Sequence, residues 1–537
     1  MNRIIRSAMH PLTVAIAGGL ACAGASAAVI EVTHSGDSGV GSLRWAVETA
    51  NGNADPFNEI VFASATDGVP IVLDTPIEIS KYLIITGNGV GETVIDGDDA
   101  TSLFAITWGV ERVEMSHVSL VNGFNALTGQ GGGAITSFAG QLVLGDIELR
   151  DNTAYYSGGA VLHAPDSEPS LFELRNCVVS GNQVVGSGAS RRGGGVSLVL
   201  GAGSSAAIED CEITDNSAAN GGGVSILLVE TNPQAAPQTT EIRRSTISGN
   251  SASAMGGGVL SETLYNPHLL LIEQSNLSNN TSQRGAGLNS NTPVHLVDSL
   301  VADNFASCEG GGVVFRIPNL PIYPGFVDSW EVVNSTISGN GSSPIVCLMG
   351  GAGLFITAEA GAPEPHSLRV AHSTIAFNQL TTVISITGGS GAGVLNLTDW
   401  PVLIDHSIVT DNPIAGGTLD HAIRGQFEVS WSLIGPQVFD SNNTHIVEGP
   451  GLQYVTTGRL QPLADNGGWT RTHKLQPDSP ARTAGDPDFS PPPALDQRAD
   501  PAFPRVANDR IDIGAFESQL DIVFANGFGD YHQPQPD

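Results

Sequence analysis

The chain has 537 residues and a formal net charge of -32 at neutral pH, because 54 acidic residues outnumber 22 lysines and arginines. A surface that acidic repels nucleic acid and acidic membranes, so neither is an expected partner. The composition also excludes a disordered polymer. Only 14% of the residues are charged and 41% are hydrophobic, whereas disordered chains are rich in charge and poor in apolar residues.

Residues 1–28 have the pattern of a secretory signal peptide. Arg3 and Arg6 precede an apolar run, and Ala25-Ser26-Ala27 supplies the small residues of a cleavage site. We therefore expect an exported chain that is secreted or held at the outer cell surface. The alternative is a lipoprotein anchored through Cys22, but Gly19 stands where such proteins carry a large aliphatic residue. No later stretch has the roughly 18 apolar residues of a membrane helix, so the mature chain should have no transmembrane segment.

Residues 29–112 predict an N-terminal cap and the first coils. Leu43, Ala46, Val47 and Ala50 fall on one face of a short helix, and Ser42 is placed to cap its N-terminus. We expect this helix to lie across the first coil of the domain that follows. Strand-like segments come next, at residues 59–62, 71–73, 83–85 and 94–95.

A six-residue phrase ending in asparagine recurs through residues 113–449. Its clear copies are Cys177–Asn182, Cys211–Asn216, Ser245–Asn250, Ser275–Asn280 and Ser335–Asn340. With the weaker copies, the terminal asparagines are Asn152, Asn182, Asn216, Asn250, Asn280, Asn304, Asn340, Asn378 and Asn412, which are 24 to 38 residues apart. A period near 32 residues is typical of a solenoid.

A glycine cluster lies between successive asparagine phrases, as in Gly193–Val196 and Gly221–Val224. The short runs between the two phrases alternate apolar and polar residues, for example from Leu269 to Leu277, and none has a helical stripe. Ankyrin and tetratricopeptide arrays need helices of ten or more residues, and leucine-rich repeats need a dense leucine ladder. We therefore predict an all-β, right-handed parallel β-helix with three short strands per coil.

Stacking of coils about 4.8 Å apart explains the asparagines. Each buried amide can donate to the asparagine of one neighbouring coil and accept from the other, so the nine asparagines should form a ladder. Glycine should supply positive φ at the other corner. In the phrase Ser-Thr-Ile-Ser, the first serine and the isoleucine should both face inward.

The cysteines occupy matching places in consecutive coils. Cys177 and Cys211 open the same phrase, while Cys308 and Cys347 each come two to three residues before a glycine cluster. Their α-carbons should lie about one coil apart, which a disulfide can span. In an oxidising compartment we predict the pairs Cys177 with Cys211 and Cys308 with Cys347. The alternative is four buried thiols that act as small hydrophobic residues.

Two segments resemble known families of secreted bacterial β-helix proteins. Asp37–Val47 with Ala50-Asn51 resembles the CSLREA-type N-terminal segment, although Gly41 replaces the cysteine of that motif. The glycine and asparagine phrases resemble the repeats of polymorphic outer-membrane proteins, and the array as a whole resembles pectin-lyase-like solenoids. Residues 450–518, with motifs such as Pro462–Thr470 and Asp512–Glu517, are similar to the choice-of-anchor Q domain. This resemblance implies an irregular C-terminal cap with an attachment role, followed by a tail at 519–537.

Catalytic and metal-binding patterns are weak in this sequence. Asp98-Asp99 is the one paired aspartate, and it sits in a turn without the partner motifs of a polygalacturonase. Asp405-His406 resembles a pectate-lyase phrase, but the same slot in other repeats varies freely. The arginine pairs 191–192 and 243–244 fall at different phases of the repeat and should not converge. We therefore assign no catalytic, cofactor-binding or metal-binding residue, with calcium at Asp96, Asp98 and Asp99 as the alternative.

The sequence favours a monomeric, adhesin-like protein whose long face binds an extracellular glycan or a partner surface without catalysis. Aromatic residues such as Trp108 and the pair Tyr155-Tyr156 more often fill turns than bind ligands. The first alternative is a polysaccharide lyase or hydrolase with a non-standard site in the insertions at 231–240 or 319–328. The second alternative is a passive structural spacer.

Overall fold

The computed structural model describes residues 28–126, 131–166, 169–186, 188, 190–229, 238–264, 268–320, 328–343, 347, 350–381, 390–414, 421–436, 444–507 and 510–519. The predicted signal peptide, apart from residue 28, and the tail after residue 519 lie outside this range. So does most of each of the two insertions, at 230–237 and 321–327.

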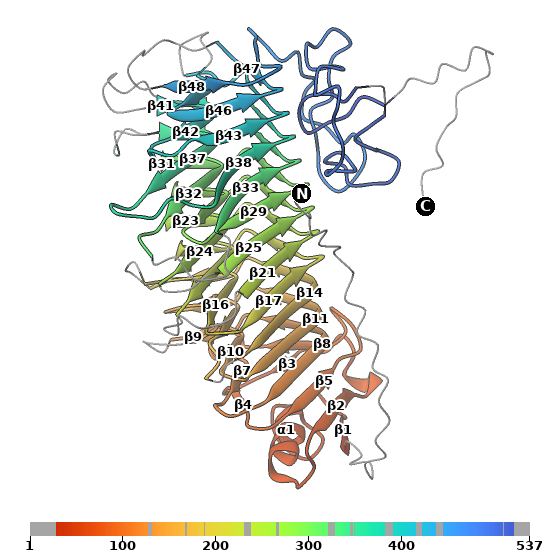
Figure 1. Cartoon of the computed structure of the whole chain (residues 1–537). Helices are drawn as coiled ribbons and strands as arrows, with labels where there is room; N and C mark the ends of the chain where they lie inside the picture. Colours follow the sequence, from red (N-terminus) through yellow and green to blue (C-terminus); the bar gives the residue numbers. More distant parts are fainter. Residues whose placement is uncertain are drawn as a thin grey trace, which may run out of the picture.

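The fold is the predicted right-handed parallel β-helix (Figure 1). Each strand pairs in parallel with the equivalent strand of the next coil, and within the described residues the strands form three long sheets of 26, 12 and 9 strands. The 26-stranded sheet, sheet A, consists of two series of parallel paired strands that lie at an angle to each other, which we call its first and second ladders. Three ten-residue strands run through both ladders, namely β8 (Arg112–Val121), β11 (Gln141–Arg150) and β14 (Leu171–Ser180).

The other strands of sheet A alternate between the two ladders. The first ladder holds β1 (Ala28–Val32), β2 (Asn58–Phe62), β5 (Leu83–Thr86), β17 (Ser205–Glu209), β21 (Gln238–Arg243), β25 (His268–Glu273), β29 (Val294–Val297), β33 (Ser329–Val333), β38 (Ser367–Ala371), β43 (Val402–Asp405), β46 (Gln426–Ser430) and β48 (His445–Glu448). The second ladder holds β3 (Ile71–Val72), β6 (Val94–Asp96), β18 (Glu212–Thr214), β22 (Thr246–Ser248), β26 (Asn276–Ser278), β30 (Leu300–Ala302), β34 (Thr336–Ser338), β39 (Thr374–Ala376), β44 (Ile408–Thr410), β47 (Leu433–Ile434) and β49 (Gln453–Tyr454).

The two remaining long sheets complete each coil. Sheet B, which follows the glycine turns, holds β4 (Ile77–Ile79), β7 (Phe104–Ile106), β10 (Ile135–Ser137), β13 (Val161–His163), β16 (Val196–Leu200), β20 (Val224–Leu228), β24 (Val259–Thr263), β28 (Leu288–Ser290), β32 (Val313–Ile317), β37 (Leu354–Ala358), β42 (Val394–Asn396) and β45 (Ile423–Arg424). Sheet C, which follows the asparagine turns, holds β9 (Phe124–Asn125), β12 (Thr153–Ala154), β15 (Gln183–Val184), β19 (Ser217–Asn220), β23 (Ser251–Met255), β27 (Thr281–Arg284), β31 (Phe305–Glu309), β35 (Gly341–Ser342) and β40 (Gln379–Leu380). β36 (Gly350–Gly351) pairs with β41 (Ser390–Gly391).

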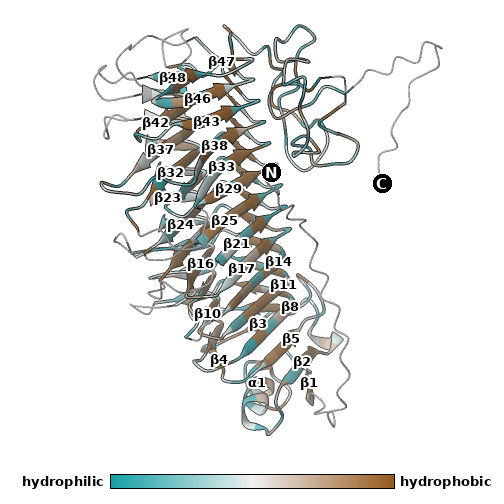
Figure 2. Ribbon diagram, viewed as in Figure 1, coloured by the Kyte–Doolittle hydropathy of each residue, from teal (hydrophilic) through white to brown (hydrophobic). Residues whose placement is uncertain are grey.

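Alternation along the strands decides which residues form the core. In the phrase that begins at Ser245, Ser245 and Ile247 are buried, whereas Thr246 and Ser248 face outward, as predicted. Ile213, Ile247 and Leu277 occupy the same position in consecutive coils, so aliphatic side chains stack along the axis. Figure 2 shows hydrophobic residues following the strands through the whole stack, as this register requires.

Residues with positive φ occur at other corners of each coil as well as in the glycine turns. The residue before each ladder asparagine has positive φ, for example Asp215 at 56° and Gly249 at 69°. A third column lies between the two ladders of sheet A, where Gln274 has a φ of 52°. The run from Leu269 to Leu277 is therefore two strands with a bend, rather than one. Aspartate, asparagine and histidine tolerate this conformation better than other residues with a side chain.

Helix α1 (Leu43–Gly52) covers the N-terminal coil, as predicted. The hydroxyl of Ser42 accepts a hydrogen bond from the backbone N–H of Trp45 at 3.1 Å. Leu43, Ala46, Val47 and Ala50 are buried against β1, β2 and β4. A short 3₁₀ helix, η1 (Ser64–Thr66), follows β2.

The C-terminal segment, residues 455–519, is irregular but does not lie over the end of the stack. It folds back along the second ladder of sheet A and covers the coils between Asp298 and Asp411 (Figure 1). Leu460, Leu475 and Ile513 from this segment pack with Ile408 and Leu433 of the stack. The segment therefore covers the side of the stack instead of its end. It can pack there because the outward positions of these late coils are apolar or small. Within the described residues, no helix is both long and apolar enough to cross a membrane.

Candidate functional site

A groove of about 360 Å³ opens on the outer face of the first ladder of sheet A, near its C-terminal end. Arg369, Leu403, Glu428 and Val447 occupy the same outward position in successive coils from β38 to β48. The full lining comprises Arg369, Leu403, Ile404, Asp405, Glu428, Val429, Ser430, Val447, Gly449 and Pro450. Leu403 is 39% exposed and Val447 50% exposed, so the groove has an apolar floor between charged groups.

Asp405 supplies a fixed negative charge to this groove. Its carboxylate accepts a hydrogen bond from the hydroxyl of Ser430 at 3.0 Å and lies 3.9 Å from the guanidinium of Arg369. Burial by itself raises the pKa of Asp405, but His406, Ser430 and Arg369 together outweigh it and hold the pKa below its ordinary value. Asp405 is therefore an acceptor at neutral pH and is unsuited to donate a proton to a glycosidic oxygen.

Two stacked histidines lie behind Asp405, at the bend between the two ladders. The rings of His372 and His406 have centroids 4.8 Å apart and are nearly parallel, at 9°, and Phe489 of the C-terminal segment packs edge-on against both. The Nε2 atom of His406 accepts a hydrogen bond from the backbone N–H of Asp486 at 3.1 Å. This acceptor role assigns the proton of neutral His406 to Nδ1, which lies 3.0 Å from the carboxylate of Asp405.

His372, Asp405 and His406 place their potential metal-ligand atoms within 4.8 Å of one another. Their arrangement does not suit a bound metal. A metal ion must lie near the plane of each ring that binds it, and one ion cannot lie in two parallel planes. Binding through Nδ1 of His406 would also move its proton to Nε2, where it would face the N–H of Asp486. The surroundings hold His372 neutral, because burial lowers its pKa well below the ordinary value, and positive charges including Arg505 lower it further. The three residues instead join the groove to the C-terminal segment.

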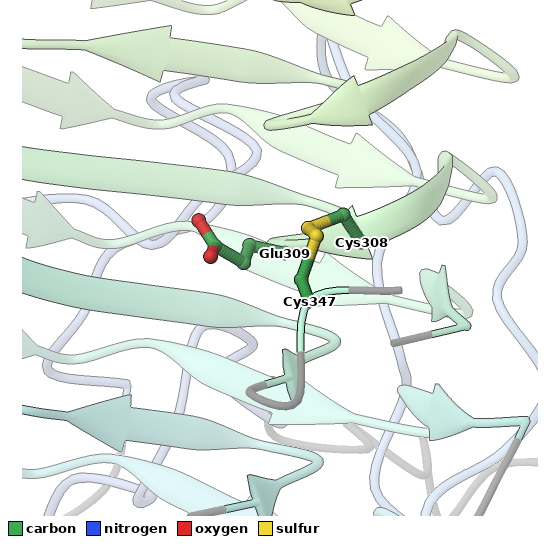
Figure 3. A group of neighbouring side chains, drawn as sticks. All are labelled: Cys308, Glu309 and Cys347. Atoms are coloured by element: carbon green, nitrogen blue, oxygen red, sulfur yellow. A yellow bond between two sulfur atoms is a disulfide. The ribbon is translucent and has the colours of Figure 1, made fainter. Parts of the chain in front are cut away.

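Cys308, Glu309 and Cys347 form a second cluster of this kind (Figure 3). The two sulfur atoms are bonded to each other, with α-carbons 5.5 Å apart, so neither is a free thiolate ligand. Glu309 points away from the disulfide in Figure 3, and its carboxylate lies 3.4 Å from Arg284 and 3.9 Å from Arg316. The disulfide therefore joins consecutive coils, and the two arginines balance the nearly buried charge of Glu309.

The structure brings the predicted ladder residues together as one column. Each asparagine from Asn152 to Asn378 donates from its side-chain amide to the side-chain oxygen of the asparagine one coil on, at 2.8 to 3.0 Å. The structure also joins Cys177 to Cys211, with α-carbons 4.6 Å apart. Both sets of residues are buried inside the stack, so they support the scaffold and do not face a ligand.

The weaker candidates do not converge on a site. Asp98 and Asp99 lie in a turn with positive φ, where Asp96 accepts hydrogen bonds from the N–H of Asp98 and from Asn122. The arginine pairs lie apart and their members have local partners. Arg192 pairs with Glu262, Arg243 with Glu241 and Glu273, and Arg244 with Asp210, while the guanidinium of Arg191 lies over the rings of Tyr155 and Tyr156.

The groove was not predicted from the sequence. Asp405 and His406 were interpreted as ordinary variation between repeats, and the register agrees with this interpretation, since Ala371 occupies the position of Asp405 one coil earlier. A column-by-column reading of outward positions would have found the signal. Arg369, Leu403 and Glu428 follow one another in one column, so charged and apolar groups alternate along the axis.

Comparisons with known proteins add little to this geometry. No protein-family model matches the sequence, and no curated protein matches it. Among solved structures, the chain is similar to the PL6 family alginate lyase AlyGC at 11% sequence identity, over 80% of this chain and 89% of that one, with a TM-score of 0.18. A TM-score that low carries no argument about function, and the fold rests on the strand pairing described above.

Proposed function

We propose that this protein is an exported, surface-associated or secreted β-helix protein that binds a glycan or a partner surface without catalysis. The observation that carries the proposal is the groove on the first ladder of sheet A. Its floor of Leu403 and Val447 suits the apolar face of a ligand, and Arg369, Asp405 and Glu428 supply a donor and acceptors beside it. The predicted signal peptide and the anchor-like C-terminal segment support an extracellular role.

The rival is a polysaccharide lyase or hydrolase. It gains some support because Asp405, Glu428 and Arg369 line the same groove, and such residues can act as acids, bases or charge stabilisers. The lowered pKa of Asp405 weighs against this residue as the catalytic acid, since a catalytic acid needs a raised pKa. The third function is a passive spacer, which applies if the chain retains no polysaccharide and no partner surface.

One experiment separates the three functions. The exported chain is incubated with a panel of polysaccharides and of cell-surface fractions, with and without calcium, and both retention and new reducing or unsaturated ends are scored. We expect retention without new ends. New ends would support the enzyme, and failure to retain any polysaccharide or cell-surface fraction would support the spacer.

Two variants assign retention to the groove. Leu403→Asp places a charge on the floor and should weaken retention of the polymers that the groove binds. Val178→Asp is the matched control, because Val178 has a similar exposure, 38% against 39%, on a distant part of sheet A. Equal retention by both variants would exclude the groove as the binding site.

A further inference from the structure

An open aromatic face lies at the other end of the stack. The indole of Trp108, in the turn between β7 and β8, stacks on Phe138 of the next coil with ring centroids 4.1 Å apart and an angle of 9°. Trp108 is nevertheless 59% exposed. Since Phe138 covers one face of the indole, this exposure comes from the opposite face and the edges. The stacked indole therefore presents a flat apolar face to solvent.

Three other surface aromatic residues pack against cations of the chain itself. The guanidinium of Arg191 lies 5.1 Å from the ring centroid of Tyr155 and 4.5 Å from that of Tyr156. Trp469 in the C-terminal segment is 55% exposed, but Arg244 lies over its ring at 5.9 Å. Trp108 therefore differs from Trp469, which has a similar exposure, in that no cation among the described residues lies over its ring.

A hydrogen-bonded polar network begins next to this aromatic turn. Arg112, four residues after Trp108, donates to Glu114 at 2.7 Å and to Gln141 at 2.6 Å. The hydroxyl of Tyr82 donates to Glu114 at 3.0 Å. Gln141 starts β11, three residues after Phe138, and pairs in register with Arg112. The network is partly exposed, so it can offer donors and acceptors to a ligand that lies on the indole.

We propose that Trp108 and the network of Arg112, Glu114 and Gln141 form a second binding site, which takes a neutral polysaccharide. Sugar rings have flat apolar faces that stack on an indole, and their hydroxyls both donate and accept. Arg112 is paired with Glu114, and the carboxylate of Asp166 accepts a hydrogen bond from the N–H of Gly109 beside Trp108, so the site has no surplus positive charge to attract an acidic ligand. The chain as a whole has a net charge of -32 and repels acidic polymers.

This site rests on the proposed binding function but not on the groove. The two lie many coils apart on the first ladder of sheet A, Arg112 on β8 and Leu403 on β43, so a single substitution cannot disturb both directly. Failure of one site in an experiment can therefore be told from failure of the other.

Affinity electrophoresis in native gels tests the inference. The gels contain hydroxyethylcellulose, galactomannan or arabinoxylan as neutral polymers, or polygalacturonate as an acidic one. We expect at least one neutral polymer to retard the wild-type chain and polygalacturonate to have no effect. Trp108→Ala should weaken binding at least tenfold and Trp108→Phe less than that, while the similarly exposed control Trp469→Ala should bind like the wild type.

The inference is overturned if no neutral polymer retards the wild type, or if Trp108→Ala binds as tightly as the wild type. Equal melting temperatures show that the variant is folded. Gln141→Ala, which removes only a partly exposed amide, is the second variant and should also weaken binding. Loss of binding with Leu403→Asp but not with Trp108→Ala would leave the groove standing and refute this site.

Discussion

Asn250 makes the contacts that recur along the asparagine ladder. Its backbone N–H and its side-chain amide both donate to the side-chain oxygen of Asn280 at 3.0 Å, and the amide also donates to the carbonyl of Ile213 at 2.9 Å. Its own side-chain oxygen accepts two hydrogen bonds from Asn216. All these groups are buried, so each ladder residue satisfies polar atoms of three consecutive coils.

Replacing a central ladder residue should therefore be costly. Asn250→Ala removes the oxygen that accepts from both the backbone N–H and the side-chain amide of Asn216, and it removes the amide that donates to the carbonyl of Ile213. Because these groups are buried, we expect the free energy of unfolding to fall by about 3 kcal/mol. Thr246→Ala in the same phrase changes an outward residue and should cost less than about 0.5 kcal/mol. Urea unfolding measures both, and equal losses would show that the ladder contributes no special stability.

Two core histidines make stability depend on pH. Burial lowers the pKa of His163 and of His268 to about 3. Both stay neutral in the folded chain, whereas in the unfolded chain they take up a proton near pH 6.5. Proton uptake by the unfolded state lowers stability as pH falls below about 6.5, by up to about 1.4 kcal/mol per unit for each histidine.

We therefore expect the double variant His163→Gln, His268→Gln to lose less stability than the wild type between pH 7 and pH 4. Unfolding by urea at several pH values measures the two slopes. Identical slopes would mean that burial does not lower the pKa of either histidine in the folded chain.

At the scale of strands, the two outward positions of each phrase differ between coils that face solvent and coils that the C-terminal segment covers. In β18, which faces solvent, these positions hold Glu212 and Thr214. In β39, which lies under the C-terminal segment, they hold Thr374 and Ala376. Charged and polar residues give way to small and apolar ones along the array, because the covered coils exclude water. This trend is readable in the sequence once the register is known.

Disulfides also connect the strands and turns of consecutive coils. Cys177 and Cys211 match in register, since Val178 pairs with Glu212 on the neighbouring strand. Thiol titration of the exported chain, denatured without reductant, should find no free thiol among Cys177, Cys211, Cys308 and Cys347. Four free thiols would show that these cysteines act only as small buried residues.

At the scale of the whole molecule, the C-terminal segment is held to the flank by both apolar and polar contacts. Beside the cluster around Leu475 and Ile513, the side chain of Thr336 donates to Gln497 at 2.5 Å, and Ser338 contacts His473 at 2.8 Å. Arg505 is fully buried and bonds to Asn334. The segment should therefore protect the late coils from solvent and protease.

Ile513→Asp places a charge in this apolar cluster and should release the segment. Limited proteolysis with mass spectrometry should then show cleavage after about residue 455, while the coils before it stay intact. Val506→Asp is the control, because Val506 is 46% exposed. Equal resistance of Ile513→Asp and the wild type would show that the apolar cluster does not hold the segment.

The β-helix and its asparagine column were predictable from the order of residues, because they follow from contacts between equivalent positions of successive repeats. The helical cap was predictable from its own apolar face and capping serine. The period, the alternation and the capping serine are local, and stacking converts them directly into structure. The inward serine and isoleucine of each phrase were predictable for the same reason.

The place of the C-terminal segment, and the sets of side chains that share the groove or the aromatic turn, became evident only in the folded chain. Thr336 and Gln497 are 161 residues apart and do not share a repeat position, so no period relates them. Trp108 and Phe138 come from turns, whose geometry the repeat leaves free to vary. A repeat specifies what stacks upon itself, while contacts between unlike parts depend on shape and burial that appear only when the whole chain has folded.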